Sequence, residues 1–316
     1  MKSLDFGHHL LGGFAAAVIL AGCGGSQPPI GAPGAMPQSR TGARQAAKSG
    51  DLIYVMGPTA TYILSYDDGS LLKSFNETSG FVGLCSDSQG NVFMPHRGAI
   101  SKYAHGGTKT IAQLSDQNYL PRACSVDPNS GDLAVANLST YTQGGGNIAV
   151  YRNASGEPAF YSTPQVTTYY SCAFDASGNL FIGGRNASTP YILAELPKGS
   201  SAIQILNLNK AVDGVGNIQW DGQYIAVGAH GSDIIYRVTV SGSNATVVGT
   251  VTLHGIRHQA DDNFWLPTGT IITSAGPHNG SVGLWRYPRG GKLKALYHVL
   301  NKGLLGGITV SLTPSR

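Results

Sequence analysis

The chain has 316 residues, of which only 12% are charged, and its formal net charge is +4. The lysines and arginines are scattered rather than gathered into a basic stripe, so the composition gives no reason to expect nucleic-acid binding. Only three residues are glutamates, Glu77, Glu157 and Glu195, which leaves few options for catalysis by paired carboxylates.

The N-terminal segment has the pattern of an export signal. Lys2 precedes an apolar run from Leu10 to Leu20, which is too short to span a bilayer. The residues Leu20-Ala21-Gly22-Cys23 resemble the lipobox of bacterial lipoproteins. This resemblance implies that residues 1–22 are a signal peptide, that Cys23 is lipidated, and that Gly24 permits sorting to an outer membrane. An ordinary secretory signal with a coincidental cysteine is the alternative.

Residues 23–49 continue with a tract rich in Gly, Pro, Ser and Gln, which cannot bury a hydrophobic core. We interpret it as a flexible tether with a root-mean-square reach of roughly 25–30 Å. The tract would hold a folded domain, residues 50–316, clear of a membrane surface. The protein is therefore expected to be extracytoplasmic and anchored to a bacterial membrane through its lipid.

A repeated pattern dominates the rest of the chain. It consists of a short apolar strand, a turn that begins with Asp, and a second apolar strand. It is clear in "GLCSDSQGNVFM" (83–94), "RACSVDPNSGDLAV" (122–135) and "SCAFDASGNLFIG" (171–183), and weaker in "IQWDGQYIAVG" (218–228) and "FWLPTGTIITS" (264–274). Each unit continues with two more strand-like runs. Four strands at this period are typical of a β-propeller blade.

The two ends of the folded region complement each other. "SGDLIYVMG" near its start matches the second strand of a unit, and "ITVSLTPSR" at its end matches a first strand and turn. The sequence therefore predicts an all-β propeller whose C-terminal strand completes the first blade, an arrangement known as Velcro closure. At about 44 residues per unit the count is six four-stranded blades, with five or seven as alternatives.

The run "DASGNLFIGG…YILAEL" resembles six-bladed propellers of the NHL-repeat and gluconolactonase-like group. The resemblance implies the same fold and, in many members, an acidic residue at the end of the second strand. Here that place holds His96, Asn137, Gly184 or Gly228, so the sequence departs from the family at the position of any carboxylate metal site.

Polar residues are expected around one face of the ring. The loops between second and third strands supply His96, Arg97, Asn137, Arg185, Asn186, His230 and His278. The loops between blades supply Tyr119, Arg122, Tyr169, Tyr170, Asn217, Arg257 and His258. Histidines and arginines with few acids favour an anionic ligand or a histidine-coordinated divalent metal. His258 and His230 are the first choices, although solvated polar side chains are expected on a rim whatever its function.

The repeated aspartates should lie on the opposite face and cap their own turns. Cys124 and Cys172 occupy matching places on neighbouring blades, whereas Cys85 is one position out of register. We expect buried free thiols, with a Cys124–Cys172 disulfide as the alternative.

Two functions fit this sequence. The first is a non-catalytic binding module whose propeller face holds a protein partner or a small ligand. The second is a metal-assisted hydrolase, similar to a lactonase, or a lyase acting at the mouth of the central channel. The anchor, the tether and the lack of a recognisable catalytic motif favour the first.

Overall fold

The computed structural model describes residues 50–78, 82–212, 214–255, 264–267, 269–274, 280–301, 303 and 305–314. All of them belong to the larger of two contact units of the chain, Arg40–Arg316. The predictions for Cys23, Arg257, His258 and His278 concern residues outside this part.

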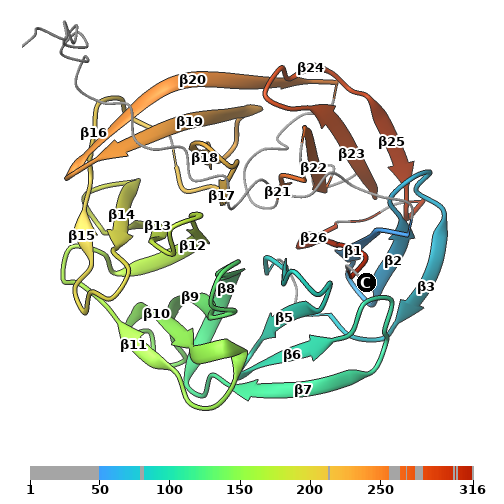
Figure 1. The fold of residues 1–316 in the computed structure, drawn as a ribbon, viewed down its shortest axis with the longest axis horizontal. Helices are drawn as coiled ribbons and strands as arrows, with labels where there is room; N and C mark the ends of the chain where they lie inside the picture. The colour runs from blue at the N-terminus through green and yellow to red at the C-terminus, as the bar shows by residue number, and fades with distance from the viewer. Residues whose placement is uncertain are drawn as a thin grey trace, which may run out of the picture. The chain divides into compact units, whose positions relative to one another are not determined.

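Six antiparallel sheets are arranged in a ring, as predicted (Figure 1). From the centre outward, blade 1 contains β26 (Ile308–Ser311), β1 (Leu52–Met56), β2 (Thr61–Ser65) and β3 (Leu71–Phe75). Blade 2 contains β4 (Cys85–Ser86), β5 (Val92–His96), β6 (Ala99–Tyr103) and β7 (Thr110–Ser115). Blade 3 contains β8 (Tyr119–Val126), β9 (Leu133–Thr140), β10 (Gly145–Tyr151) and β11 (Ala159–Tyr161), with the 3-10 turn η1 (Arg152–Ala154) before β11.

The second half of the ring repeats this plan. Blade 4 contains β12 (Thr168–Phe174), β13 (Leu180–Arg185), β14 (Ile192–Leu196) and β15 (Gln204–Ile205). Blade 5 contains β17 (Ile218–Trp220), β18 (Ile225–Gly228), β19 (Ile234–Ser241) and β20 (Asn244–His254). Blade 6 contains β21 (Phe264–Trp265), β22 (Thr270–Ser274), β23 (Ser281–Arg286) and β25 (Ala295–His298). Two short strands, β16 (Asn207–Leu208) and β24 (Gly291–Lys292), pair in parallel with the outer edge of β20.

The predicted Velcro closure is confirmed. β26 pairs antiparallel with β1, with Leu52 opposite Ser311 and Val55 opposite Ile308, and the two strands lie side by side in Figure 1. The backbone N–H of Met56 extends the pairing by donating to the carbonyl of Gly307 at 2.9 Å. Pairing of β26 with β1 leaves the first blade with a complete set of four strands.

The hydrophobic core is divided among the junctions between blades. Six clusters of buried side chains are present, and each contains residues from two neighbouring blades. The cluster that joins blades 6 and 1 packs Ile53 and Val310 against Ile272 and Leu284. Because strand residues alternate between the two faces of a sheet, each blade contributes to two clusters.

The repeated aspartates cap their turns, as predicted, on the face of the ring that carries the turns between first and second strands, here called the lower face. Oδ1 of Asp87, Asp127, Asp175 and Asp221 accepts a hydrogen bond from the backbone N–H two residues later, at 3.0, 2.9, 2.8 and 2.8 Å. Oδ2 of Asp221 also accepts from Arg237 Nε of its own blade at 2.9 Å and from the hydroxyl of Tyr287, which follows β23 of blade 6, at 2.5 Å.

The prediction of buried free thiols was wrong for Cys85 and Cys124 and is confirmed for Cys172. Cys85 and Cys124 form a disulfide between blades 2 and 3, and only Cys172 is a free, buried thiol among the described residues. Cys124 and Cys172 share one register, so each points toward the preceding blade. The one-residue shift of Cys85 turns it toward the following blade, where it meets Cys124. The one-residue difference in register, which spoke against a disulfide of Cys85 in the sequence, is what brings Cys85 and Cys124 together.

Outer strands carry a β-bulge at the same place in three blades. The pairing register skips Leu72 in β3, Ile111 in β7 and Val248 in β20. These three side chains are half exposed or more, at 52%, 57% and 50%. Bulges bend the edge of a sheet and make it a poorer template for pairing with another chain.

Candidate functional site

The turns between second and third strands lie on one face of the ring, here called the upper face, together with the segments that join blades. This follows because successive antiparallel strands alternate in direction. The predicted rim residues that lie at these turns in the structure are His96, Arg97, Arg185, Asn186 and His230. Asn137 was expected in such a turn as well, but it lies inside β9 and is buried.

The structure brings only part of this set together. His96 and Arg97 form the turn between β5 and β6 on blade 2, and Asn137 lies on the adjoining blade 3. Arg185 lies on blade 4, where its guanidinium is 5.3 Å from the ring centre of Tyr170. His230 lies on blade 5, exposed to solvent.

The residues expected in loops between blades lie at or beside the innermost strands instead. Tyr119 and Arg122 belong to β8, Tyr169 and Tyr170 belong to β12, and Asn217 directly precedes β17. Tyr169 is buried and its hydroxyl accepts a hydrogen bond from the N–H of Thr163 at 2.9 Å. Nδ2 of Asn217 donates to the carbonyl of Phe264 at 2.9 Å. Tyr169 and Asn217 therefore hold the scaffold together.

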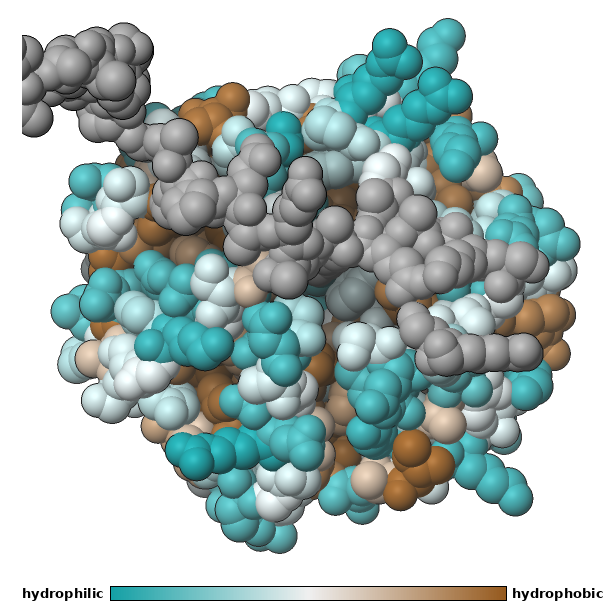
Figure 2. Space-filling model, viewed as in Figure 1, coloured by the Kyte–Doolittle hydropathy of each residue, from teal (hydrophilic) through white to brown (hydrophobic). Residues whose placement is uncertain are grey.

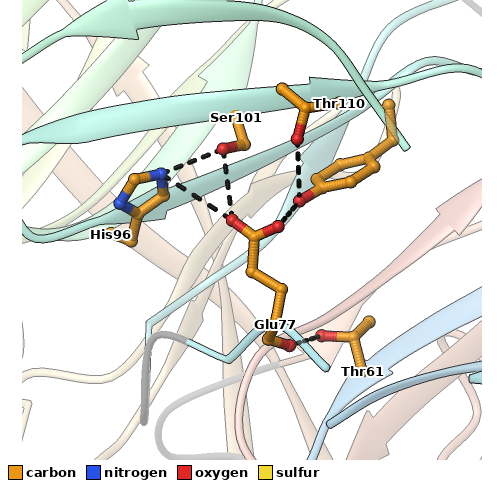
Figure 3. A network of polar contacts seen from close by, with 6 residues as sticks. Thr61, Glu77, His96, Ser101 and Thr110 are labelled. Atoms are coloured by element: carbon orange, nitrogen blue, oxygen red, sulfur yellow. Dashed lines mark hydrogen bonds and ion pairs between the residues drawn. The ribbon is translucent and has the colours of Figure 1, made fainter. Parts of the chain in front are cut away.

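A polar network built on Glu77 joins blades 1 and 2 (Figure 3). Glu77 follows β3, and its backbone carbonyl accepts a hydrogen bond from Thr61 Oγ1 at 2.6 Å. Its side chain reaches between the blades, where Oε1 accepts from Ser101 Oγ at 3.2 Å and Oε2 accepts from the hydroxyl of Tyr103. His96 Nε2 lies 2.9 Å from Ser101 Oγ and 3.9 Å from Glu77 Oε1.

These residue types match a hydrolytic triad, but their geometry does not. In a triad the acid and the nucleophile bind opposite nitrogens of the imidazole. Here the carboxylate of Glu77 and the hydroxyl of Ser101 both face Nε2 of His96. Ser101 is also only 1% exposed, so a substrate cannot approach it. The network orients His96 and fastens two blades together.

A second polar cluster, built on Asp116, lies between blades 2 and 3. Asp116 follows β7, and its backbone N–H donates to the carbonyl of Gly98 at 3.0 Å. Nδ2 of Asn137 donates to Oδ1 of Asn147 at 2.8 Å and, more weakly, to Oδ1 of Asp116 at 3.4 Å. All three polar side chains are buried. Burial raises the pKa of Asp116 to about 6, and the hydrogen bond from Asn137 opposes this only in part.

An exposed arginine and a tyrosine lie on the upper face beside this cluster. The guanidinium of Arg97 lies 4.4 Å from the ring centre of Tyr141, which belongs to the turn between β9 and β10. The N–H of Tyr141 donates to the carbonyl of Asn118 at 2.9 Å. Gly146, at the start of β10, allows this strand to lie close against β9, because a Cβ there would lie 2.0 Å from the carbonyl oxygen of Asn137.

The turn between β5 and β6 connects the two polar clusters. His96 faces Glu77 on one side, the carbonyl of Gly98 accepts from Asp116 on the other, and Arg97 extends to Tyr141 on blade 3. We call this set of upper-face residues, His96, Arg97 and Tyr141 with their supports Glu77 and Asp116, the blade 2–3 site. It presents a cation, an aromatic ring and a half-buried imidazole on a firmly held base.

Glu77 and Asp116 were missed by the sequence analysis. Both come from segments between blades, whereas the resemblance to known families directed attention to the end of the second strand. A signal was present, since "LLKSFNE" and "TIAQLSD" both place an acid just after an outer strand in successive blades. The rim is therefore less purely basic than expected.

No group of three or more His, Cys, Asp and Glu in the described part of the chain is placed to hold a metal ion. The histidine-coordinated divalent metal stays a prediction, since His258 and His278 lie outside that part. In the same part, no helix combines the length and hydrophobicity needed to cross a bilayer.

Figure 2 shows one face of the molecule, on which hydrophilic and hydrophobic side chains alternate in small patches. Among the described residues, the most exposed large apolar side chains lie on the outer strands, at Leu71, Leu72, Ile111, Phe160 and Val248. They are distributed over four blades and do not form one continuous patch at the blade 2–3 site.

Known protein families give no match to this sequence, and neither do curated proteins. Solved structures do match the fold. One, from a crystal structure of a nidogen/laminin complex, has a TM-score of 0.65 at 13% identity and covers 84% of this chain and 100% of its own. A protein of unknown function from Bacteroides caccae has a TM-score of 0.59 at 12% identity, covering 83% of this chain and 98% of its own.

A third similar structure is the β-propeller domain of Cps50 (Swd1) from Myceliophteria thermophila. It has a TM-score of 0.54 at 12% identity and covers 82% of this chain and 88% of its own. At these identities the similarities establish the β-propeller fold alone.

Proposed function

We propose that this protein is a lipid-anchored, extracytoplasmic binding module, and that a partner protein binds its upper face at the blade 2–3 site. The observation that carries the proposal is the pair formed by exposed Arg97 and half-buried Tyr141. Arginine and tyrosine are enriched among the residues that dominate binding energy at protein interfaces. Holding both side chains in place before binding reduces the entropy lost on association.

The base of the site supports binding rather than catalysis. The turn that carries Arg97 is fixed on both sides, by the contact of His96 with the Glu77 network and by the hydrogen bond from Asp116 to Gly98. Glu77, His96 and Ser101 have contacts suited to holding a ring in position, and their geometry does not fit nucleophilic catalysis.

Two further observations support the proposal. The lipobox-like residues ending at Cys23 suit a protein that presents a rigid domain at a membrane surface. One similar propeller is known from a nidogen/laminin complex, so this fold is compatible with a protein partner. The sequence resemblance to the NHL-repeat group also suits a binding role, and we include it in this proposal.

The test uses the full chain in bacterial cells. Labelled palmitate should enter the wild-type protein and not the Cys23→Ala variant. A photo-crosslinking residue at Thr142, next to Tyr141, should then capture one specific protein. Binding of that protein should weaken at least tenfold in Arg97→Ala and in Tyr141→Ala, as expected for residues central to an interface.

Arg289→Ala is the matched control, because Arg289 is an exposed arginine in the turn that follows β23, on the lower face. Its affinity for the captured protein should equal that of the wild type. Equal binding by Arg97→Ala and the wild type would refute the assignment of the site. Turnover of a lactone by the wild-type protein with added divalent metal would favour the hydrolase instead.

A further inference from the structure

Two buried oxygen atoms at the junction of blades 2 and 3 have no hydrogen-bond donor among the described residues. They are Oδ2 of Asp116 and Oδ1 of Asn137, and the two residues are 1% and 0% exposed. The cluster is linked through the 3.4 Å contact between Asn137 Nδ2 and Asp116 Oδ1. Buried acceptors without a donor are rare in native proteins, so each requires an explanation.

Exchanging the positions of Oδ1 and Nδ2 in the Asn137 amide does not provide the missing hydrogen-bond donor. Nδ2 of Asn137 donates to Asn147 Oδ1 at 2.8 Å and faces Asp116 Oδ1 at 3.4 Å. A flipped amide would turn its oxygen toward both of these oxygens and lose both hydrogen bonds. The amide orientation is therefore fixed by its neighbours, and its own oxygen needs a further partner.

A third oxygen belongs to the turn between β9 and β10. The hydroxyl of Tyr141 is also buried, without a hydrogen-bond partner in the described part of the chain, and it lies 3.1 Å from the position that a Cβ on Gly98 would take. The carbonyl of Gly98 accepts the backbone N–H of Asp116. All three oxygens thus belong to residues at the junction of blades 2 and 3.

The charge at this place is also unbalanced. No described cationic side chain forms an ion pair with Asp116. A buried carboxylate is normally paired with a positive charge or bound to a metal. A bound cation would supply the missing charge.

We propose that Asp116 and Asn137 are ligands of a buried calcium ion that joins blades 2 and 3 beneath Arg97 and Tyr141. A carboxylate oxygen and an amide oxygen are ligands that Ca²⁺ prefers, with water and backbone carbonyls filling the other positions. Asp116, Asn137 and Tyr141 offer no thiolate or imidazole, so a softer transition metal fits this site less well than Ca²⁺ does. The ion would fix the turns that carry Arg97 and Tyr141. Its binding does not require the proposed partner protein.

The test measures thermal unfolding of the full chain, solubilised in detergent and treated with a chelator. Adding Ca²⁺ alone at millimolar concentration should raise the melting temperature of the wild type, because a ligand that binds only the folded state stabilises it. The shift should disappear in Asp116→Asn, which keeps the shape of the side chain and removes its charge. Asp127→Asn changes a buried aspartate on the lower face and should keep the full shift.

Terbium luminescence gives an independent readout. Tb³⁺ replaces Ca²⁺ at oxygen sites and is excited through nearby tyrosines, here Tyr141, so the wild type and Asp127→Asn should show the signal and Asp116→Asn should not. An unchanged wild-type melting temperature with Ca²⁺ would overturn the proposal. A shift that persists in Asp116→Asn, or one produced by Na⁺ and not by Ca²⁺, would overturn it as well.

Discussion

Asp116 has the most strongly perturbed carboxyl group that the structure describes, and its pKa has a consequence for stability. Burial raises the pKa from 3.8 to about 6. Between these two pH values the folded protein binds more protons at this position than the unfolded chain does. The free energy of unfolding therefore falls as the pH rises through this window, by roughly 3 kcal/mol at most.

Asp116→Asn should remove this contribution. In calcium-free buffer, urea unfolding at pH 4 and pH 7 should show the wild type losing about 2–3 kcal/mol more than the variant over this range. The variant should also be the more stable protein at pH 7, because it buries no charge. The pKa assignment is wrong if the two proteins lose the same free energy between these pH values.

At the scale of residues, the sequence predicted the exposed half of the site better than its buried half. His96 and Arg97 could be placed on the upper face because the repeat fixes where the second strand of blade 2 ends, whereas Asn137, expected at a strand end, is buried inside β9. Glu77 and Asp116 could not be assigned a role, since their function depends on contacts with the next blade. The sequence pattern of one repeat does not show which side chains come into contact between neighbouring blades.

At the scale of elements, register decides more than residue type. A shift of one residue sends a strand's side chains to the other face of its sheet. This is why Cys85 meets Cys124 and why Cys172 packs against Ala134 and Ala136 of blade 3. The register difference was visible in the sequence, but its consequence required knowing that neighbouring blades face each other with opposite faces.

The disulfide gives a prediction at this scale. Cys85 and Cys124 are 39 residues apart, so replacing both by Ala should destabilise the protein by about 4 kcal/mol on the loop-entropy estimate. A reducing agent should lower the melting temperature of the wild type and leave that of the double variant unchanged. Cys172→Ala should stay as sensitive to reduction as the wild type. Mass spectrometry of peptides linked through Cys172 would contradict the assignment.

Short elements escaped the sequence analysis for a different reason. β16 and β24 have two residues each and pair with the edge of β20 only after the blades are in place. The bulges at Leu72, Ile111 and Val248 likewise depend on the partner strand. Neither feature has a periodic pattern long enough to detect in a single sequence.

At the scale of the whole molecule, the ring depends on one pairing between distant parts of the chain. β26 supplies the inner strand of blade 1, and Ile308 and Val310 belong to the cluster that joins blades 6 and 1. The six-bladed ring and its closure could be predicted because the repeat is regular and its two ends are complementary.

Truncation after Leu305 should therefore cost far more than the loss of four strand residues. It exposes the edge of β1 and opens the core between blades 6 and 1, so the expected result is loss of cooperative unfolding and aggregation. Circular dichroism melting and size-exclusion chromatography provide the measurement, with truncation after Pro314 as the control. A truncated chain that unfolds cooperatively as a monomer would contradict this view of the closure.

The pairing of β26 with β1 also determines when blade 1 can be completed during synthesis of the chain. The ribosome adds β26 about 250 residues after β1, which takes on the order of 10–50 seconds at ordinary elongation rates. Throughout that interval Leu52–Met56, entirely buried in the finished protein, has no inner neighbour. Blade 1 is thus the first sheet to be made and the last to be completed, and its waiting edge is where a chaperone would have most to protect.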